Sequence, residues 1–325
     1  MKLFAAIDIG SYEVEMKIFQ ITSGKGIKEI DCVCHRMELG KDVYRDGKIG
    51  VEMTDELCRV LNDFVRIMKG YRVDDWRVCA TSAVREAGNQ LVFLDRVKRH
   101  TGLEVEVLSN ASQRFMDYKS IASRENEFNR IIQKGTAIVD VGGGSIQISL
   151  FDKDRLVASQ NMKIGNLRLR ERMMNEGVSL KHYETLLTEV VKNEFLSYKK
   201  LYLKDRVISN LIVVGDHIGD AVHKNVMTRA DFLNFYDDMI YRSDEDAAGR
   251  CEVPEDVISV LRPSLVVYRC FLEAADVENI WMPGLHLTDG MAYEYAQQNR
   301  LLKLGHDFNE DILAAARNAA KRYQC

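Results

Sequence analysis

Two stretches of the chain follow one pattern, and this internal repeat constrains the fold more than any other feature. Residues 7–19 read IDIGSYEVEMKIF and residues 139–151 read VDVGGGSIQISLF. They align without a gap, so that Asp8 matches Asp140, Gly10 matches Gly142 and Phe19 matches Phe151. Each copy is an apolar strand, a D-x-G turn and a strand with alternating apolar residues, which predicts a β-hairpin. The repeat therefore predicts two similar domains that face one another across a pseudo-twofold axis.

Small residues form the tips of both hairpins. The expected phosphate-binding residues there are Gly10 and Ser11 in the first copy and Gly142, Gly143, Gly144 and Ser145 in the second. Small residues let backbone N–H groups approach an anion closely, as in a phosphate nest. One Gly-rich turn is usually only a turn, but two of them, each opening an α/β segment, favour a phosphate site in a cleft between the domains. The aspartates Asp8 and Asp140 suit a Mg²⁺ ion that bridges phosphate oxygens.

Strands alternate with helices in both halves, which predicts the α/β class with a mixed sheet in each domain. Strands are expected at 27–33, 77–80, 104–109, 136–141, 146–151, 155–162, 210–215 and 279–282. Helices are expected at 54–69, 89–100, 112–124, 165–175, 180–200, 230–242, 255–275 and 288–303. The predicted domains are residues 1–125 and 126–303, followed by a C-terminal helix over 304–325.

Composition excludes several classes of protein. A net charge of −4 is unlike the basic balance of a general DNA binder, although a local Arg and Lys cluster can still hold phosphate. No run approaches the roughly 20 apolar residues of a membrane span. Seven cysteines without a CxxC pair indicate a reduced, cytoplasmic chain. Cys32 and Cys34 flank one residue of an expected strand and should point the same way; ordinary packing is favoured there over a metal or redox role.

Several motifs together resemble the exopolyphosphatase / guanosine pentaphosphate phosphohydrolase family. They are DIGS (8–11), ATSAVREAGN (80–89), TGLEVEVLS (101–109), VDVGGGS (139–145), GNLRL (165–169) and PGLHLTDG (283–290), in the family's order. The resemblance covers about residues 1–300. It implies two actin-like (ribonuclease H-like) domains of the actin-like ATPase and sugar-kinase type, which agrees with the repeat. It also implies a phosphohydrolase that acts with Mg²⁺.

Hydroxyl and guanidinium groups are expected on the flank of the phosphate site. Thr81 and Ser82 stand at a strand end, and the Arg85 guanidinium can fork onto phosphate oxygens as a Lys cannot. Arg168 follows a glycine and is expected in the same cleft. The alternative for both arginines is a solvated helix face. The same alternative applies to the other cations of the basic stretch 163–172, which are Lys163, Arg170 and Arg172.

One departure from the family concerns catalysis. The family's Leu-Ser-Gly-x-Glu-Glu-Ala motif carries the general base, and here the segment reads LSNASQRF (108–115). Ser112 stands where the family has the catalytic Glu, and a Ser hydroxyl cannot accept a proton at neutral pH without a base of its own. The change removes a contribution of roughly 10²–10⁴ in rate. Glu13, at the first loop, is the candidate substitute base.

A second departure lies in VGDHIG (214–219), where the family has a Gly-Thr-Gly-Gly-Thr turn. Asp216 and His217 are interpreted there as turn and N-cap residues before a helix rather than as catalytic groups. The last residues, 306–325, predict an amphipathic helix that resembles the start of the HD-type third domain of longer family members.

The function expected from the resemblance is release of terminal orthophosphate from inorganic polyphosphate, weakened by Ser112. The alternatives are a guanosine pentaphosphate phosphohydrolase, a non-catalytic sensor of polyphosphate or guanosine polyphosphate, and, less favoured, an actin-like or kinase ATPase. The expected partners are the phosphorylated ligand and a second copy of the chain in a homodimer, with neither DNA nor a membrane.

Overall fold

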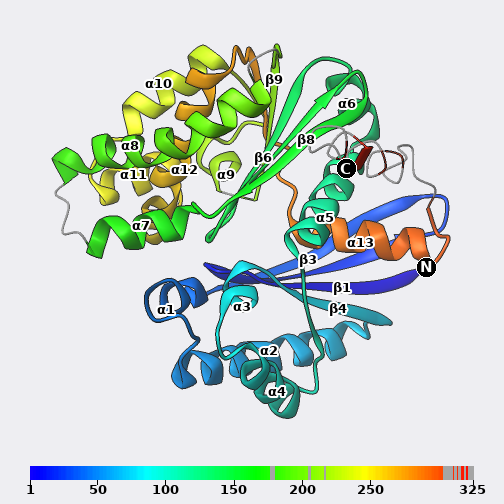
Figure 1. Cartoon of the computed structure of the whole chain (residues 1–325). Coiled ribbons are helices and arrows are strands. Elements are labelled where there is room, and N and C mark those ends of the chain that lie inside the picture. Colours follow the sequence, from blue (N-terminus) through cyan, green and yellow to red (C-terminus); the bar gives the residue numbers. More distant parts are fainter. Residues whose placement is uncertain are drawn as a thin grey trace. The chain divides into compact units, whose positions relative to one another are not determined.

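The computed structural model describes residues 1–175, 180–203, 206–215 and 217–302, together with residues 310, 313, 316, 317 and 320. The chain divides into two compact units (Figure 1). The first contains Met1–Arg124 and His286–Gly305, and the second is built on Glu125–Leu285. Most of the helix expected over 304–325 lies outside the described residues.

The first unit is a five-stranded mixed sheet with helices on both faces. Its elements in chain order are β1 (Lys2–Ile9), β2 (Glu13–Thr22), β3 (Gly26–Arg36), α1 (Leu39–Asp46), α2 (Val51–Tyr71), β4 (Asp75–Ala80), α3 (Ser82–Glu86), α4 (Gln90–Thr101), β5 (Val105–Val107), α5 (Asn110–Ala122) and α13 (Leu287–Gln298). The strand order is β3-β2-β1-β4-β5. The β1–β2 and β2–β3 pairs are antiparallel, whereas β1–β4 and β4–β5 are parallel.

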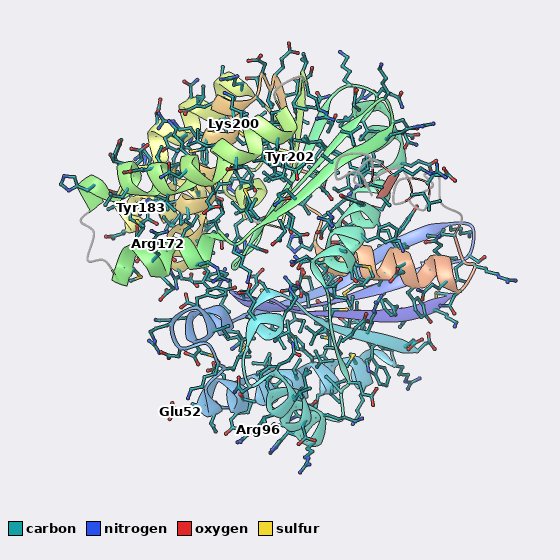
Figure 2. All side chains as sticks on the ribbon, in the orientation of Figure 1. Glu52, Arg96, Arg172, Tyr183, Lys200 and Tyr202 are labelled. Atoms are coloured by element: carbon teal, nitrogen blue, oxygen red, sulfur yellow. The ribbon has the colours of Figure 1, made fainter. Side chains whose placement is uncertain are left out.

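Alternation along β2 separates the two cores of this unit. Val14, Met16 and Ile18 face the core that includes residues of α2 and α4, while Phe19 and Ile21 face the core that includes α5 and α13. The pairing of β2 with β3 shifts register between Ile18 and Phe19, where Ile30 of β3 is an extra residue. On the α2 and α4 side, the Arg96 guanidinium of α4, labelled in Figure 2, holds the Asp55 carboxylate of α2 at 2.6 and 2.8 Å.

Helix α13 packs in the first unit, whereas the sequence analysis assigned it to the second domain. The reason is its apolar face, which buries Leu287, Met291 and Ala296 with Phe4 of β1. Tyr295 stacks on the Phe4 ring with centroids 4.2 Å apart. Gly290 permits the close approach of α5, because a Cβ there would clash with the Met116 carbonyl. The chain therefore returns to its first unit at His286.

The second unit is built on a six-stranded sheet. Its elements are α6 (Glu125–Ile131), β6 (Thr136–Val141), β7 (Ile146–Asp152), β8 (Arg155–Met162), α7 (Asn166–Asn175), α8 (Leu180–Tyr198), the π-helical turn η1 (Lys199–Leu203), β9 (Asn210–Val214), α9 (Ile218–Val222), β10 (Val226–Thr228), α10 (Arg229–Met239), α11 (Asp244–Cys251), α12 (Glu255–Ala274) and β11 (Asn279–Trp281). The strand order is β10-β11-β9-β6-β7-β8. Helix α12 runs through its core, with most of its residues buried.

The two sheets share one plan. Each has an antiparallel meander (β1-β2-β3 and β6-β7-β8), and each adds a parallel strand to the first meander strand, β4 in one and β9 in the other. This confirms the α/β class and the two related units predicted from the repeat. The predicted long elements are present with ends shifted by a few residues. The sequence analysis missed α1, α3, α6, β10 and α11, which are too short for a clear periodicity.

Candidate functional site

The hairpins predicted from the repeat are present, and their tips have the same hydrogen bond. In β1–β2 the Gly10 N–H donates to the Glu13 carbonyl at 2.9 Å, and in β6–β7 the Gly142 N–H donates to the Ser145 carbonyl at 3.0 Å. A Cβ on Gly10 would lie 2.7 Å from the Glu13 carbonyl oxygen, so the first tip requires glycine there. The repeat therefore preserves the backbone of the turn.

The first tip is lined by hydroxyl groups. The Ser11 hydroxyl lies 2.7 Å from Tyr44 Oη of α1 and 2.8 Å from Ser82 Oγ of α3. The Ser11 carbonyl accepts a hydrogen bond from the Gly40 N–H at the start of α1 at 2.8 Å. Ser11 and Ser82, which were singled out separately in the sequence, therefore lie together in the first unit.

Strand β4 brings Thr81, Ser82 and Arg85 to the same end of the first sheet. The Thr81 N–H donates to the Ile9 carbonyl at 3.2 Å, and Thr81 is the N-cap residue of α3. One terminal nitrogen of Arg85 donates to the Leu108 carbonyl at 2.6 Å and lies 3.5 Å from Gln113 Oε1. Arg85 thus joins α3 to the segment that leads into α5, and its role in phosphate binding stays a prediction.

The second tip is held by backbone contacts with α7. The carbonyls of Gly142 and Gly143 accept hydrogen bonds from the backbone N–H groups of Asn166 and Arg168, each at 3.0 Å. Arg168 Nε donates to the Gly144 carbonyl at 2.9 Å. Gly165 makes this contact sterically feasible, since a Cβ there would clash with the backbone of Gly142 and Gly143. Arg168 was predicted in the phosphate-binding cleft; the structure shows its guanidinium bracing this loop, and its role in phosphate binding stays a prediction.

This arrangement orients the second loop for anions. Its three glycine carbonyls are engaged with α7, and the N–H groups of Gly143 and Gly144 donate to no backbone carbonyl of the described residues. Successive backbone N–H groups that share a turn form a concave site for an anion. The loop can therefore bind phosphate through its backbone.

Asp140 stands at the end of β6, directly before this loop. Its side chain is buried, and Gln147 Nε2 lies 3.4 Å from Asp140 Oδ2. Gly215, with φ of +81°, follows the neighbouring strand β9, where a Cβ would clash with Asp140 Oδ1. Asp8 holds the equivalent place in β1, opposite Glu15.

The donor set fits Mg²⁺ better than a metal that needs an all-protein site. In the described part of the chain, His, Cys, Asp and Glu form no cluster of three that could hold a metal ion. Mg²⁺ is usually bound by one or two carboxylates, with waters and phosphate oxygens as its other ligands. Asp8 and Asp140 can supply such carboxylates.

Ser112 lies in the first turn of α5. Its backbone N–H donates to Ser109 Oγ, the N-cap of the helix, at 3.0 Å, and the two hydroxyl oxygens are 2.8 Å apart. Glu13, the candidate substitute base, accepts a hydrogen bond from Cys34 Sγ at 3.1 Å. The position of the family's base thus has a hydroxyl that lies within hydrogen-bonding distance of the N-cap serine of α5.

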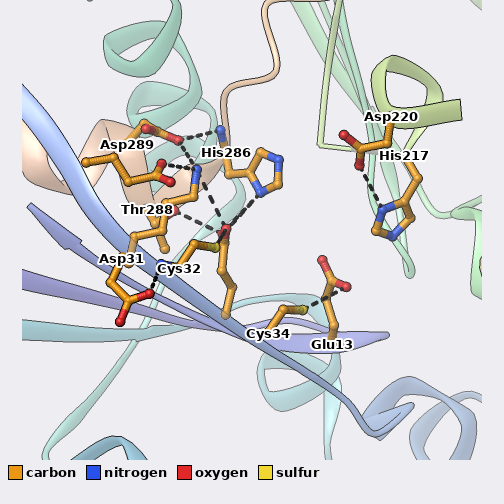
Figure 3. Close-up of polar contacts among 12 residues, drawn as sticks. Glu13, Asp31, Cys32, Cys34, His217, Asp220, His286, Thr288 and Asp289 are labelled. Atoms are coloured by element: carbon orange, nitrogen blue, oxygen red, sulfur yellow. Dashed lines mark hydrogen bonds and ion pairs between the residues drawn. The ribbon is translucent and has the colours of Figure 1, made fainter. Parts of the chain in front are cut away.

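The sequence analysis missed a buried group of charged residues next to Asp8 (Figure 3). The Glu15 carboxylate lies 3.1 Å from His286 Nδ1 and accepts a hydrogen bond from the Thr288 hydroxyl at 3.0 Å. Lys17 Nζ binds Asp289 Oδ2 at 2.9 Å. The available signal was Glu15 and Lys17, two charged residues at alternate positions of an otherwise apolar strand.

The charges of this group shift one another's titration. Burial alone would raise the pKa of Glu15, but the His286 and Lys17 charges and the hydrogen bonds outweigh it and lower the pKa to about 2. Burial alone would lower the pKa of His286, and the charge of Glu15 with its hydrogen bond raises it to about 9. At neutral pH both groups are therefore charged, and Glu15 is a weak proton acceptor.

Two further predictions concern the second unit. Arg170, from the basic stretch 163–172, is buried and donates to Glu171 at 2.8 Å and to Ser259 Oγ at 2.9 Å, so its guanidinium is committed within the fold. His217 is the N-cap residue of α9, as favoured from the sequence, with Nδ1 3.6 Å from Asp220 Oδ2. Asp216 lies outside the described residues.

Membrane insertion through a helix has no support in the described part of the chain. None of its helices combines the length and the apolar character that crossing a bilayer requires.

Solved structures with a similar architecture include two from related proteins. A Ppx/GppA family member of Aquifex aeolicus superposes with a TM-score of 0.73 at 22% identity, covering 92% of this chain and 98% of that one. An exopolyphosphatase of Cytophaga hutchinsonii gives a TM-score of 0.80 at 17% identity, covering 91% and 98%. At these identities the likeness shows a shared fold.

Curated relatives match the chain over about half its length. A bifunctional 3-dehydroquinate synthase/phosphatase of Fusobacterium nucleatum is 26% identical over 52% of this chain and 26% of its own. Exopolyphosphatase 2 of Mycobacterium tuberculosis is 27% identical over 53% of this chain and 54% of its own. The chain therefore spans about half or less of the length of these relatives.

A family model covers most of the chain. The model of the Ppx/GppA phosphatase family matches residues 17–298, which include the second hairpin tip, the β4–α3 segment and the His286 segment. The paired hairpins, the loop braced by α7 and this match lead to one conclusion: the chain belongs to the Ppx/GppA phosphatase family.

Proposed function

We propose that this chain binds inorganic polyphosphate or a guanosine polyphosphate and hydrolyses its terminal phosphoanhydride bond slowly. The observation that carries the proposal is the second loop, whose carbonyls are engaged with α7 and whose Gly143 and Gly144 N–H groups are available to an anion. Relatives named exopolyphosphatase and guanosine-5′-triphosphate,3′-diphosphate pyrophosphatase support this class of substrate.

The proposed reaction is an attack of water on the terminal phosphorus. The bond from that phosphorus to the bridging oxygen breaks, so that the shortened chain leaves with the bridging oxygen. The attacked phosphorus becomes orthophosphate, and one proton of the water passes to solvent or to a base. The N–H groups of the second loop bind phosphate oxygens, and Arg85, Thr81 and Ser82 bind others at the end of β4. Asp8 in the first unit and Asp140 in the second would each offer a carboxylate to Mg²⁺, which would neutralise charge on the phosphate oxygens when bound.

The slow rate follows from the weak basicity of the groups that could accept the proton of the attacking water. Ser112 offers a hydroxyl that already contacts Ser109, and Glu15 is a weak proton acceptor because its pKa is about 2. Glu13 remains the candidate base at the first loop. Positioning and charge neutralisation supply most of the rate enhancement in phosphoryl transfer, so some activity should remain without the family's Glu.

The same observation favours a second candidate, a binding protein without catalysis. The hydroxyl at position 112 removes the base and leaves the second loop intact. The two candidates share the ligand and differ in turnover. Phosphate release from polyphosphate with Mg²⁺ separates them.

The deciding experiment restores the base. Ser112→Glu should raise the rate of phosphate release by about 10²-fold or more, the usual contribution of a positioned general base. The fold should tolerate it, because a Glu three residues after the Ser109 N-cap completes a capping box. Ser112→Gln is the matched control, with the same shape and no basic group.

Steady-state assays of both variants and the parent protein, on polyphosphate and on a guanosine polyphosphate, measure the effect. A fast parent rate that disappears in Glu13→Gln would show that Glu13 is the base. A rate unaffected by all three substitutions would contradict the placement of the base. Binding is measured separately by calorimetry with Gly143→Val, which should lose affinity for polyphosphate while circular dichroism stays unchanged; equal affinity would overturn the role of the second loop.

A further inference from the structure

A groove of about 370 Å³ lies on the second unit, among α9, α10 and α11 (Figure 1). We call it the α10 groove. Its floor is apolar, because Met227 of β10 and Ala221 of α9 are buried and Phe235 of α10 packs against the core of the unit. None of its described lining residues belongs to the second tip or to α7. A pocket of this size, with an apolar floor and a few polar groups around it, is typical of sites for small organic molecules.

Polar contacts to α11 hold both walls of the α10 groove. On one wall, His223, the C-cap residue of α9, places Nε2 3.1 Å from the Cys251 carbonyl oxygen at the end of α11. On the other wall, Asp238 of α10 accepts a hydrogen bond from Arg242 Nε at 3.2 Å and lies 3.7 Å from Arg250 Nε of α11. The walls are therefore fixed by the fold, as in the largely preformed sites of small ligands.

One face of α10 lines the groove from end to end. Four of its residues share the i, i+3, i+4, i+7 spacing of a single helical face: Asp231, Asn234, Phe235 and Asp238. The two aspartates are two turns apart, about 10 Å along the helix axis. This wall therefore presents an aromatic ring and an amide between two carboxylates.

The two carboxylates are already bound by groups of the chain. Asp231 accepts hydrogen bonds from the Thr228 hydroxyl at 2.8 Å and from the Thr228 N–H at 3.2 Å. These bonds, and less strongly the charge of Lys224, lower the pKa of Asp231. Asp238 is bound by Arg242, as described above. Carboxylates that are held in this way leave the recognition of a ligand to the other polar groups of the groove.

The donors that stay available are cationic or neutral. The Lys224 ammonium and the Asn234 amide line the groove and have no hydrogen-bond or ion-pair partner among the described residues. An ammonium supplies three donors and no acceptor, whereas an amide supplies both kinds of group. Charge complementarity therefore favours a ligand with an anionic group.

We infer that the α10 groove binds a small organic anion with a planar ring, of the size of a purine nucleoside monophosphate. The ring covers Met227 and lies against the aromatic side chain of Phe235. The anionic group binds the Lys224 ammonium, and the Asn234 amide binds the polar edge of the ring. Inorganic polyphosphate does not match this site, because it has no apolar part to cover the floor.

Calorimetry with AMP as the probe tests the site. The parent should bind AMP. Adenosine, which lacks the anion, and ribose 5-phosphate, which lacks the ring, should each bind at least about tenfold more weakly, since each loses one of the two main contacts. Absence of AMP binding at millimolar concentration, or an equal affinity for AMP and either fragment, would overturn the proposal.

Substitutions at Lys224 test the contact with the anion. Lys224→Met keeps the length of the side chain and removes its charge, so it should bind AMP about tenfold more weakly, as expected for the loss of one charge-assisted hydrogen bond. Lys224→Arg should bind AMP as the parent does. Lys200→Met is the matched control, because Lys200, labelled in Figure 2, is exposed on η1 of the same unit and does not line the groove. If Lys224→Met and Lys200→Met bind AMP equally, the proposal is wrong.

Gly143→Val separates this site from the proposed phosphate site. The substitution changes the second tip and leaves the α10 groove intact, so the variant should bind AMP as tightly as the parent while it loses affinity for polyphosphate. Loss of AMP binding in Gly143→Val would place AMP at the second tip and overturn the groove. Retention of polyphosphate affinity, with AMP binding lost only in Lys224→Met, would overturn the proposed function and support the groove. Circular dichroism shows whether each variant keeps the fold.

Discussion

The two hairpin tips share a backbone and differ in chemistry. Both close with the same glycine N–H hydrogen bond, and both follow an aspartate at the end of a central strand. The second tip consists of glycines held by α7, whereas the first carries Ser11 in a group of hydroxyls with Tyr44 and Ser82. The repeat therefore preserves a turn geometry, and each unit fills it with different donors.

The same contrast extends to the residue opposite each aspartate. Glu15 pairs with Asp8 across the first hairpin, and Gln147 pairs with Asp140 across the second. Glu15 is charged and is held by three residues. His286 directly precedes α13, Thr288 lies in the first turn of α13, and Lys17 lies in β2. Gln147 is neutral and almost fully buried. The first unit thus needs the returning α13 segment to neutralise its hairpin, and the second does not.

The largest effect is expected where the second tip meets α7. Gly165→Ala places a Cβ against the backbone of Gly142 and Gly143, so either the loop or α7 must move. We expect a loss of about 4 kcal/mol in the free energy of unfolding, the size of a severe steric conflict, and a loss of polyphosphate affinity. Urea unfolding and calorimetry measure the two effects.

Gly70→Ala is the control for that variant. A Cβ on Gly70, in α2, meets no atom within 4 Å, and alanine in a helix is about 0.5–1 kcal/mol more favourable than glycine. If Gly165→Ala were as stable as Gly70→Ala, the close contact between the second loop and α7 would be wrong.

A smaller loss of stability is expected when the residue opposite Asp8 is exchanged for the type that stands opposite Asp140. Glu15→Gln leaves the buried Lys17 and the partly exposed His286 without one of their counter-charges. Breaking a fully buried ion pair costs about 3–5 kcal/mol, and the exposure of His286 reduces the expected loss to about 2 kcal/mol. The mirror change, Gln147→Glu, buries a carboxylate beside Asp140 with no histidine to pair with it. Both should lower the midpoint of urea unfolding; stability equal to the parent in both would show that the pairing is interchangeable.

The pH dependence of stability sharpens the same comparison. The pKa of Glu15 lies below its ordinary value of 4.5, so its contribution is present above pH 4.5 and is lost as the pH falls toward 2. The pKa of His286 lies above its ordinary value of 6.5, so its contribution is present below pH 6.5 and is lost as the pH rises through about 9. The parent should be more stable at pH 4.5–6.5 than above pH 9, and Glu15→Gln should reduce this difference. An unchanged pH profile would contradict the ion pair.

The repeat made the two sheets and their tips predictable, because strand alternation and a D-x-G turn are local signals. The unit to which α13 belongs was not predictable in the same way. Helical periodicity shows that α13 has an apolar face, but it does not show which core buries that face. Only the packing of α13 on Phe4 and Met116 assigns it to the first unit. The Glu15–His286 pair was missed for the same reason, since its partners are far apart in the chain. Arg168 was found by motif, but its contact with the Gly144 carbonyl required the fold.

The smallest effect is expected from the hydroxyls that distinguish the first tip. Ser11→Ala removes hydrogen bonds to Tyr44 and Ser82 and should cost about 1 kcal/mol of stability. Tyr44→Phe removes one end of the same network, so the double variant should lose less than the sum of the single losses. If Ser11 also binds phosphate, Ser11→Ala should weaken polyphosphate binding, whereas Tyr44→Phe should affect it less. If the stability losses of the two single variants add up to that of the double variant, the hydroxyls act separately. If Ser11→Ala binds polyphosphate as tightly as the parent, the role of Ser11 is limited to holding the turn.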